Sequence, residues 1–239
     1  MPSSAQLEHR QDAAPEAAAN RQTTAPLFPL FLKLAGRACL VVGAGREGEA
    51  KISSLLATGA SVRVVAPEAT AAVDRWARLG RLEWMARGFE DSDLDGMFLA
   101  VVATSRRELN QHVYQEAERR RVLCNVVDDP PHCDFYYPSV VRRGALQIAI
   151  STDGKSPALA QRLRRELERQ FGPEYEEWID ALGRERARLF RQAMDPELRR
   201  RRLHELASEE SFEAFVRSRP AAGAKRKGQE GRKAPEEEP

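Results

Sequence analysis

The chain has 239 residues, and its 42% hydrophobic content is enough to bury one large core, or a core and a smaller module. The net charge of +2 neither requires nor excludes nucleic acid, and we expect none as a partner. No apolar run is long enough for a membrane span or a signal peptide. Three cysteines, an odd number without close pairing, are typical of a reduced compartment. We therefore expect a cytoplasmic protein that does not bind membranes.

Strand and helix patterns alternate over the first half of the chain. Strands are predicted over 38–42, 61–66, 82–85, 97–103 and 123–127, and helices over 47–58, 70–79 and 107–120. Such alternation predicts a parallel sheet with right-handed crossovers, which is a Rossmann-like α/β fold. The ends of the chain, 1–26 and 219–239, lack apolar periodicity and are expected to be disordered.

The pattern changes after Asp128. Two strand-like runs, 135–141 and 146–152, flank a glycine-containing turn and predict a β-hairpin. Ser156 and Pro157 then open a helix that ends near Phe171, and further helices are predicted over 174–194, 195–207 and 208–217. A lone hairpin has unpaired edges, so we expect a homodimer in which the hairpins of two chains pair.

A glycine-rich turn joins the first predicted strand to the first helix. Gly43 permits the tight turn, Gly45 leaves room for phosphates, and Gly48 brings helix and strand together. The second strand delivers Glu68 about 20 residues later, a spacing that suits the ribose hydroxyls of a dinucleotide. The sequence therefore predicts a dinucleotide-binding domain that prefers NAD to NADP.

Polar residues follow two later strands at the edge where open α/β sheets bind ligands. Asp128 is a candidate proton acceptor, or alternatively a loop cap, and Asp129 is interpreted as a turn residue. His132 is the rival base, or an ordinary loop histidine. Thr104 contacts a cofactor or only caps the next helix. His132 and Cys133 lack further ligand residues nearby, so no bound metal is expected.

Several segments together resemble the precorrin-2 dehydrogenases, which correspond to the N-terminal half of siroheme synthase. The resemblance covers about residues 27–190, and its most specific pieces are Asn125-Val126-Val127-Asp128 and Ser156-Pro157-Ala158-Leu159-Ala160. It implies a dinucleotide-binding domain over 27–134, a dimerisation module over 135–165 and a helical domain over 166–218. After Met194 too few residues remain in this sequence for a methyltransferase domain.

The resemblance also implies an activity, with NAD as cofactor: oxidation of precorrin-2 to sirohydrochlorin in siroheme biosynthesis. Some relatives insert Fe(II) into the product, so Fe(II) is a second candidate substrate. Residue by residue, it places Gly43, Gly45, Arg46 and Glu47 at the pyrophosphate, Pro67 and Glu68 at the adenosine end, and Asp128 and Thr152 at the tetrapyrrole. Where relatives often have alanine, this chain has Gly48, which we expect to loosen the helix start slightly.

Arginines are the natural partners of a substrate that carries carboxylates on its acetate and propionate arms. Arg142 and Arg143 in the hairpin turn and Arg162 on the following helix are the candidates. Two other functions remain open at this point: a non-catalytic domain that senses NAD, and a dehydrogenase of a small hydroxy or amino acid.

Overall fold

The computed structural model describes residues 26–219, which form two units that divide between Tyr137 and Pro138. The expectations of disorder for 1–26 and 219–239 therefore fall almost entirely outside the described residues. Within 26–219, none of the helices combines the length and apolar character that a membrane span needs. Each unit is described in turn.

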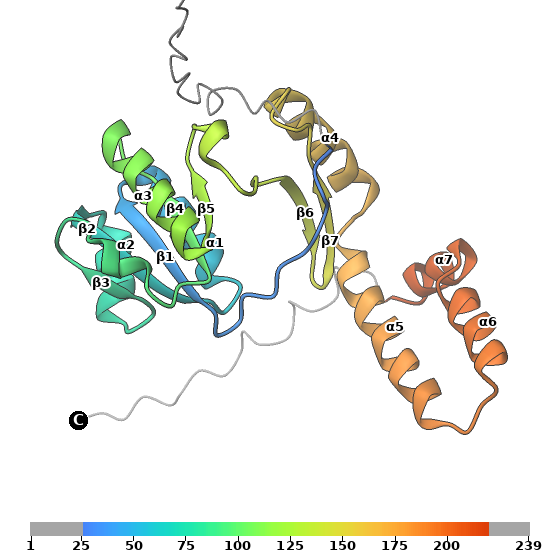
Figure 1. Cartoon of the computed structure of the whole chain (residues 1–239). Coiled ribbons are helices and arrows are strands. Elements are labelled where there is room, and N and C mark those ends of the chain that lie inside the picture. The colour runs from blue at the N-terminus through green and yellow to red at the C-terminus, as the bar shows by residue number, and fades with distance from the viewer. Residues whose placement is uncertain (1–25, 220–239) are drawn as a thin grey trace, which may run out of the picture. The chain divides into compact units, whose positions relative to one another are not determined.

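The first unit is a five-stranded parallel sheet in the order β3-β2-β1-β4-β5 (Figure 1). Its strands are β1 (Ala38–Ala44), β2 (Ser61–Ala69), β3 (Glu83–Met85), β4 (Leu99–Val102) and β5 (Leu123–Val126). The helices are α1 (Arg46–Leu56), α2 (Ala71–Arg78) and α3 (Arg107–Arg120), with short 3₁₀ turns η1 (Asp91–Leu94) and η2 (Pro130–His132). The strand order reverses between β1 and β4, which is the switch point where such sheets bind dinucleotides.

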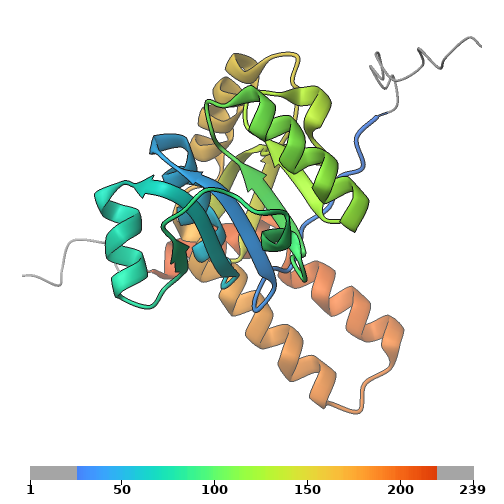
Figure 2. The ribbon, with the colours of Figure 1, turned by 60° about the vertical axis from the view of Figure 1, so that its left-hand side comes forward.

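Two apolar clusters bury the two faces of this sheet because its strands are hydrophobic on both sides. On one face Val41 and Val64 pack with Ile52 of α1 and Val73 of α2. On the other face residues of β1, β4 and β5 pack with Val113 of α3 and with η1. Figures 1 and 2 show the helices on both faces of the sheet. The predicted Rossmann-like fold is confirmed.

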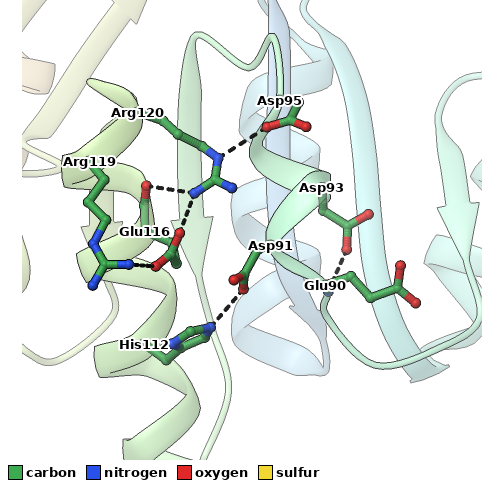
Figure 3. Close-up of polar contacts among 8 residues, drawn as sticks. All are labelled: Glu90, Asp91, Asp93, Asp95, His112, Glu116, Arg119 and Arg120. Carbon is green, nitrogen blue, oxygen red and sulfur yellow. Dashed lines mark hydrogen bonds and ion pairs between the residues drawn. The ribbon is translucent and has the colours of Figure 1, made fainter.

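The crossover from β3 to β4 carries η1, which the sequence patterns did not predict. Its Asp93 is buried and accepts hydrogen bonds from both terminal nitrogens of Arg87, at 2.8 and 2.6 Å. Glu116 of α3 is also buried and accepts from Arg119 and Arg120, and Arg120 reaches Asp95 at 3.1 Å (Figure 3). The Arg87 pair fixes η1 to the loop before it, and the pair of Arg120 with Asp95 fastens this segment to α3, in place of a crossover helix.

The second unit contains an antiparallel hairpin and four helices. The hairpin joins β6 (Ser139–Arg143) to β7 (Leu146–Ile150) through a two-residue turn, and α4 (Pro157–Gln170) and α5 (Glu174–Arg191) pack against it. The helices α6 (Pro196–Leu206) and α7 (Glu209–Ser218) follow. The first strand begins at Ser139 and not at Phe135 as predicted, because Phe135 packs into the core of the first unit.

Candidate dinucleotide and proton-transfer site

The glycine turn after β1 lies beside the end of β4, at the switch point of the sheet. Gly43 has a φ of +100°, and a Cβ there would stand 2.4 Å from the Ala103 carbonyl oxygen. A Cβ on Gly48 would stand 2.2 Å from the Gly43 carbonyl oxygen. Both glycines are therefore required by backbone contacts. For Gly48 this corrects the expectation of a loosened helix start, because the missing Cβ is what lets α1 meet the turn.

Gly45 differs from these two glycines because its Cβ position faces open space. Apart from Gly45 itself and its chain neighbours, no atom of residues 26–219 lies within 4 Å of a Cβ built there. Gly45 is the N-cap of α1 and makes no side-chain cap, while Arg46 and Glu47 are exposed in the first turn of the helix. Backbone N–H groups at such a helix start attract anions. The turn therefore has the space and the donors that a dinucleotide pyrophosphate requires.

The adenosine end predicted from the sequence lies at the end of β2. This strand continues to Ala69, beyond its predicted end, and Pro67 and Glu68 are both exposed. The Thr70 N–H donates to the Ala44 carbonyl at 3.1 Å, which keeps this segment beside the end of β1. Arg63, the cation in this strand, is paired with Glu83 at 2.7 Å. Glu68 is thus the exposed charge at the strand end.

Thr104 follows β4 and contributes to the same edge of the sheet. Its hydroxyl is hydrogen-bonded to the Asn110 side chain and accepts from the Arg106 N–H, and the Asn110 amide donates back to the Thr104 carbonyl at 2.9 Å. The N-cap of α3 is Arg106 and not Thr104. The Thr104 hydroxyl therefore donates its hydrogen to the Asn110 side chain. Asn110, buried and absent from the sequence prediction, fixes the loop after β4.

Asp128 occupies a turn directly beyond β5, with its side chain exposed. The Asp129 N–H donates to the Val126 carbonyl at 3.2 Å and closes the turn, and Asp128 has a φ of +59°. Left-handed backbone favours glycine, and aspartate adopts it more readily than most residues but at a cost of up to about 1 kcal/mol. The fold therefore holds a carboxylate in a strained conformation at the ligand-binding edge of the sheet.

The loop after this turn is fastened back onto β5. The Asn125 amide donates to the Phe135 carbonyl at 2.8 Å, and the Asp134 carboxylate accepts from the Cys124 N–H at 2.9 Å. Burial raises the pKa of the Cys124 thiol to about 12, so this cysteine is inert at neutral pH. Cys133 contacts the Val126 carbonyl through its sulfur at 3.2 Å. Within residues 26–219, no group of three or more His, Cys, Asp and Glu is placed to hold a metal ion.

Asp129 and His132, interpreted from the sequence as a turn residue and a rival base, form a pair in the structure. His132 Nδ1 lies 2.9 Å from the Asp129 carboxylate, and both side chains are about 29% exposed. A carboxylate only accepts, so Nδ1 carries the hydrogen. The imidazole also packs edge-on against Tyr114 of α3, at 4.9 Å between ring centroids.

In the second unit, the Arg143 side chain makes structural hydrogen bonds to backbone carbonyls. Its guanidinium donates to the Phe171 and Glu168 carbonyls at the end of α4, at 2.8 Å each, and to the Arg142 carbonyl. These bonds cap the end of α4, and the predicted contact of Arg143 with substrate stays a prediction. Arg142 is exposed, and Arg162 is exposed with Glu166 3.6 Å away.

Thr152 lies in the tight turn between β7 and α4. Asp153 and Gly154 at the centre of this turn both have positive φ, and the Lys155 N–H donates to the Thr152 carbonyl at 2.9 Å. The Thr152 hydroxyl accepts from the Ser156 N–H at 3.1 Å. The turn thus delivers Ser156 to its position as N-cap of α4, where its hydroxyl accepts from the Leu159 N–H.

Comparisons with known proteins agree with this geometry. Residues 30–139 match a family model described as "Putative NAD(P)-binding", and residues 143–170 match the central region of sirohaem biosynthesis proteins. Siroheme synthase 1 of Serratia proteamaculans is 35% identical over 83% of this chain and 42% of its own length. Siroheme synthase of Photorhabdus laumondii is 43% identical over 59% of this chain and 30% of its own length.

The chain therefore spans less than half the length of these two relatives. A solved structure, "SirC, precorrin-2 dehydrogenase", superposes with a TM-score of 0.67 at 27% identity, over 80% of this chain and 98% of that one. The dinucleotide-binding match covers the glycine turn, Glu68 and Asp128, and the central match begins in the hairpin. The chain belongs to the family of siroheme-biosynthesis proteins that includes the siroheme synthases and SirC.

Proposed function

We propose that this protein is a cytoplasmic, NAD-dependent precorrin-2 dehydrogenase that forms sirohydrochlorin in siroheme biosynthesis. The observation that carries the proposal is the strained Asp128 turn, which presents a carboxylate at the same sheet edge as the glycine turn. The superposition on SirC over 98% of that chain supports the same substrate. The three free cysteines fit a reducing compartment.

The reaction removes a hydride and a proton from the macrocycle. NAD, when bound, accepts the hydride. The Asp128 carboxylate accepts the proton, a role that its exposed position after β5 permits. The open space at Gly45 and the first-turn N–H groups of α1 hold the pyrophosphate, and Glu68 accepts hydrogen bonds from the ribose diol.

The substrate is a polycarboxylate, so cations of the second unit are assigned to its side arms. Arg142, Arg143 and Arg162 are proposed for this role, and Arg142 and Arg162 are the more exposed of the three. Thr152 remains a candidate contact because its oxygen only accepts from Ser156, which leaves its hydroxyl hydrogen to donate.

Anaerobic turnover of precorrin-2 with NAD tests the proposal. The protein should produce NADH and sirohydrochlorin together, and Asp128→Asn should lower the rate by roughly 10²- to 10⁴-fold with little change in NAD affinity. Asp180→Asn, an exposed aspartate on α5, is the matched control. NAD binding without turnover would instead indicate an NAD-sensing domain. Turnover only of small hydroxy or amino acids would indicate another dehydrogenase.

We also propose a homodimer built on the hairpin. Two strands alone leave both edges unpaired, and pairing with the hairpin of a second copy closes one of them with two-fold symmetry. Light scattering at micromolar concentration should give twice the mass of the chain. A monomer throughout would remove this proposal.

Insertion of Fe(II) into sirohydrochlorin is a second activity for the same edge of the sheet. Metallation releases two pyrrole protons, and Asp128 accepts them at the position proposed for the macrocycle. Sirohydrochlorin and Fe(II), incubated anaerobically without NAD, should form siroheme faster with the protein than without it. Equal rates would restrict the enzyme to dehydrogenation.

A further inference from the structure

Two residues on one face of α3 reach the two strand-end loops nearest the switch point. Asn110 holds the loop after β4 through Thr104, and Tyr114 contacts the loop after β5 through His132. Residues four apart share one face of a helix, so a single turn of α3 supports both loops. The helix itself is fixed, because Val113 and Ala117 are fully buried against the sheet.

Asp129, the residue next to Asp128, is held by this support at several points. Its carboxylate accepts from His132 Nδ1 at 2.9 Å, and its carbonyl accepts from the His132 N–H at 3.0 Å. Its own N–H closes the turn onto Val126. A strained, non-glycine residue at positive φ persists where the surrounding structure fixes its backbone. For Asp128, the contacts of its neighbour Asp129 supply this constraint.

We propose that Tyr114, His132 and Asp129 form a positioning relay that holds Asp128 in its strained turn. The inference rests on the proposed function, because it assumes that Asp128 accepts the proton. His132 is then neither a rival base nor an ordinary loop histidine. Through this histidine the position of α3 determines the position of the turn, and its Nδ1–H donates to the Asp129 carboxylate.

The chain offers a close comparison for this pair. His112, also on α3, lies 2.7 Å from Asp91 of η1 (Figure 3). That pair has the same chemistry, but its side chains are 49% and 50% exposed and it ties α3 to η1, away from the Asp128 turn. Loss of the imidazole at 112 therefore removes a comparable contact and leaves the turn intact.

The experiment compares His132→Ala, His132→Asn and His112→Ala in steady-state oxidation of precorrin-2. Misplacement of a reacting group by about 1 Å costs up to 10²-fold, so His132→Ala should lower kcat by roughly 10- to 100-fold. NAD affinity and the KM for precorrin-2 should stay within about twofold of wild type, because no binding contact is removed. His132→Asn places an amide N–H near the position of Nδ1 and should restore most of kcat. His112→Ala should keep the wild-type kcat.

A double-mutant cycle separates positioning from general destabilisation. In an Asp128→Asn background, His132→Ala should lower the residual rate no further, because the relay acts through the carboxylate at 128. An equal loss in both backgrounds, or an unchanged kcat for His132→Ala, would overturn the proposal.

Hydrogen exchange supplies a readout that does not depend on the reaction. The amides of residues 127–133 should exchange faster in His132→Ala, at the wild-type rate in His112→Ala, and near that rate in His132→Asn. Unchanged exchange in His132→Ala would refute the relay. If wild type fails to oxidise precorrin-2 while this exchange pattern holds, the proposed function fails and the structural relay stands.

Discussion

Two glycines where β1 meets α1 predict different effects of the same substitution on stability. A Cβ on Gly48 would stand 2.2 Å from the Gly43 carbonyl oxygen and 2.9 Å from its carbon, and both are backbone atoms. Alanine gains about 0.5–1 kcal/mol over glycine in a helix. Overpacking against backbone costs typically 1–3 kcal/mol or more. Gly48→Ala should therefore lower the free energy of unfolding by about 1–2 kcal/mol and weaken NAD binding as the turn shifts.

Gly45→Ala is the matched variant, because no described residue beyond its chain neighbours lies within 4 Å of a Cβ built there. Without cofactor this variant should unfold within about 0.5 kcal/mol of wild type, since the loss at the N-cap and the lower entropy of the unfolded chain nearly cancel. Its NAD affinity should fall at least tenfold, because the new methyl group occupies the space assigned to the pyrophosphate. Urea unfolding without NAD and calorimetric titration with NAD measure the two quantities separately.

The reasoning fails if Gly48→Ala is as stable as wild type and binds NAD normally. In that case the contact between α1 and the Gly43 carbonyl would not be as close as the structure has it. The assignment of Gly45 fails separately, if Gly45→Ala keeps its NAD affinity.

Three further predictions concern single side chains. Glu68→Gln should shift the ratio of kcat/KM for NAD over NADP by roughly tenfold toward NADP, because the charge that repels a 2′-phosphate is removed; an unchanged ratio would exclude Glu68 from the ribose site. Asp128→Gly should raise the free energy of unfolding by up to about 1 kcal/mol while abolishing turnover. Asp153 also has a positive φ, so Asp153→Gly should give a similar stabilisation in urea unfolding. Arg143→Met should lower stability by about 1–3 kcal/mol through loss of its bonds at the end of α4, whereas Arg142→Met should raise KM for the substrate without changing the urea midpoint.

The parts of the fold that depend on local pattern could be predicted from the sequence. The parallel sheet follows from alternating strand and helix patterns, and α3 begins and ends at its predicted residues, 107 and 120. The 3₁₀ turn η1 could not be predicted, because the segment from Glu90 to Asp95 is mostly acidic and lacks periodicity. Its position depends on Arg120, which is distant in sequence and reaches Asp95.

The candidate site likewise has parts that the sequence predicts and parts that it does not. The sequence identified the glycine turn because its spacing is a local signal. It did not distinguish Arg143 from Arg142, since the carbonyls that Arg143 caps lie 25 and 28 residues further along the chain. It also passed over Asn110, whose only signal is an amide in the first turn of a helix that follows Thr104.

The two neighbouring aspartates show most clearly what the sequence alone leaves open. Asp128 and Asp129 have the same side chain, and in the sequence only the proline that follows distinguishes them. In the structure Asp129 commits its carboxylate to His132, while Asp128 is exposed on a backbone that costs free energy to maintain. A loop that needed only to connect β5 to the next segment would be more stable with glycine at 128. The proposed proton transfer accounts for an aspartate at this position, and the proposed support of the turn accounts for the contact between its neighbour and His132.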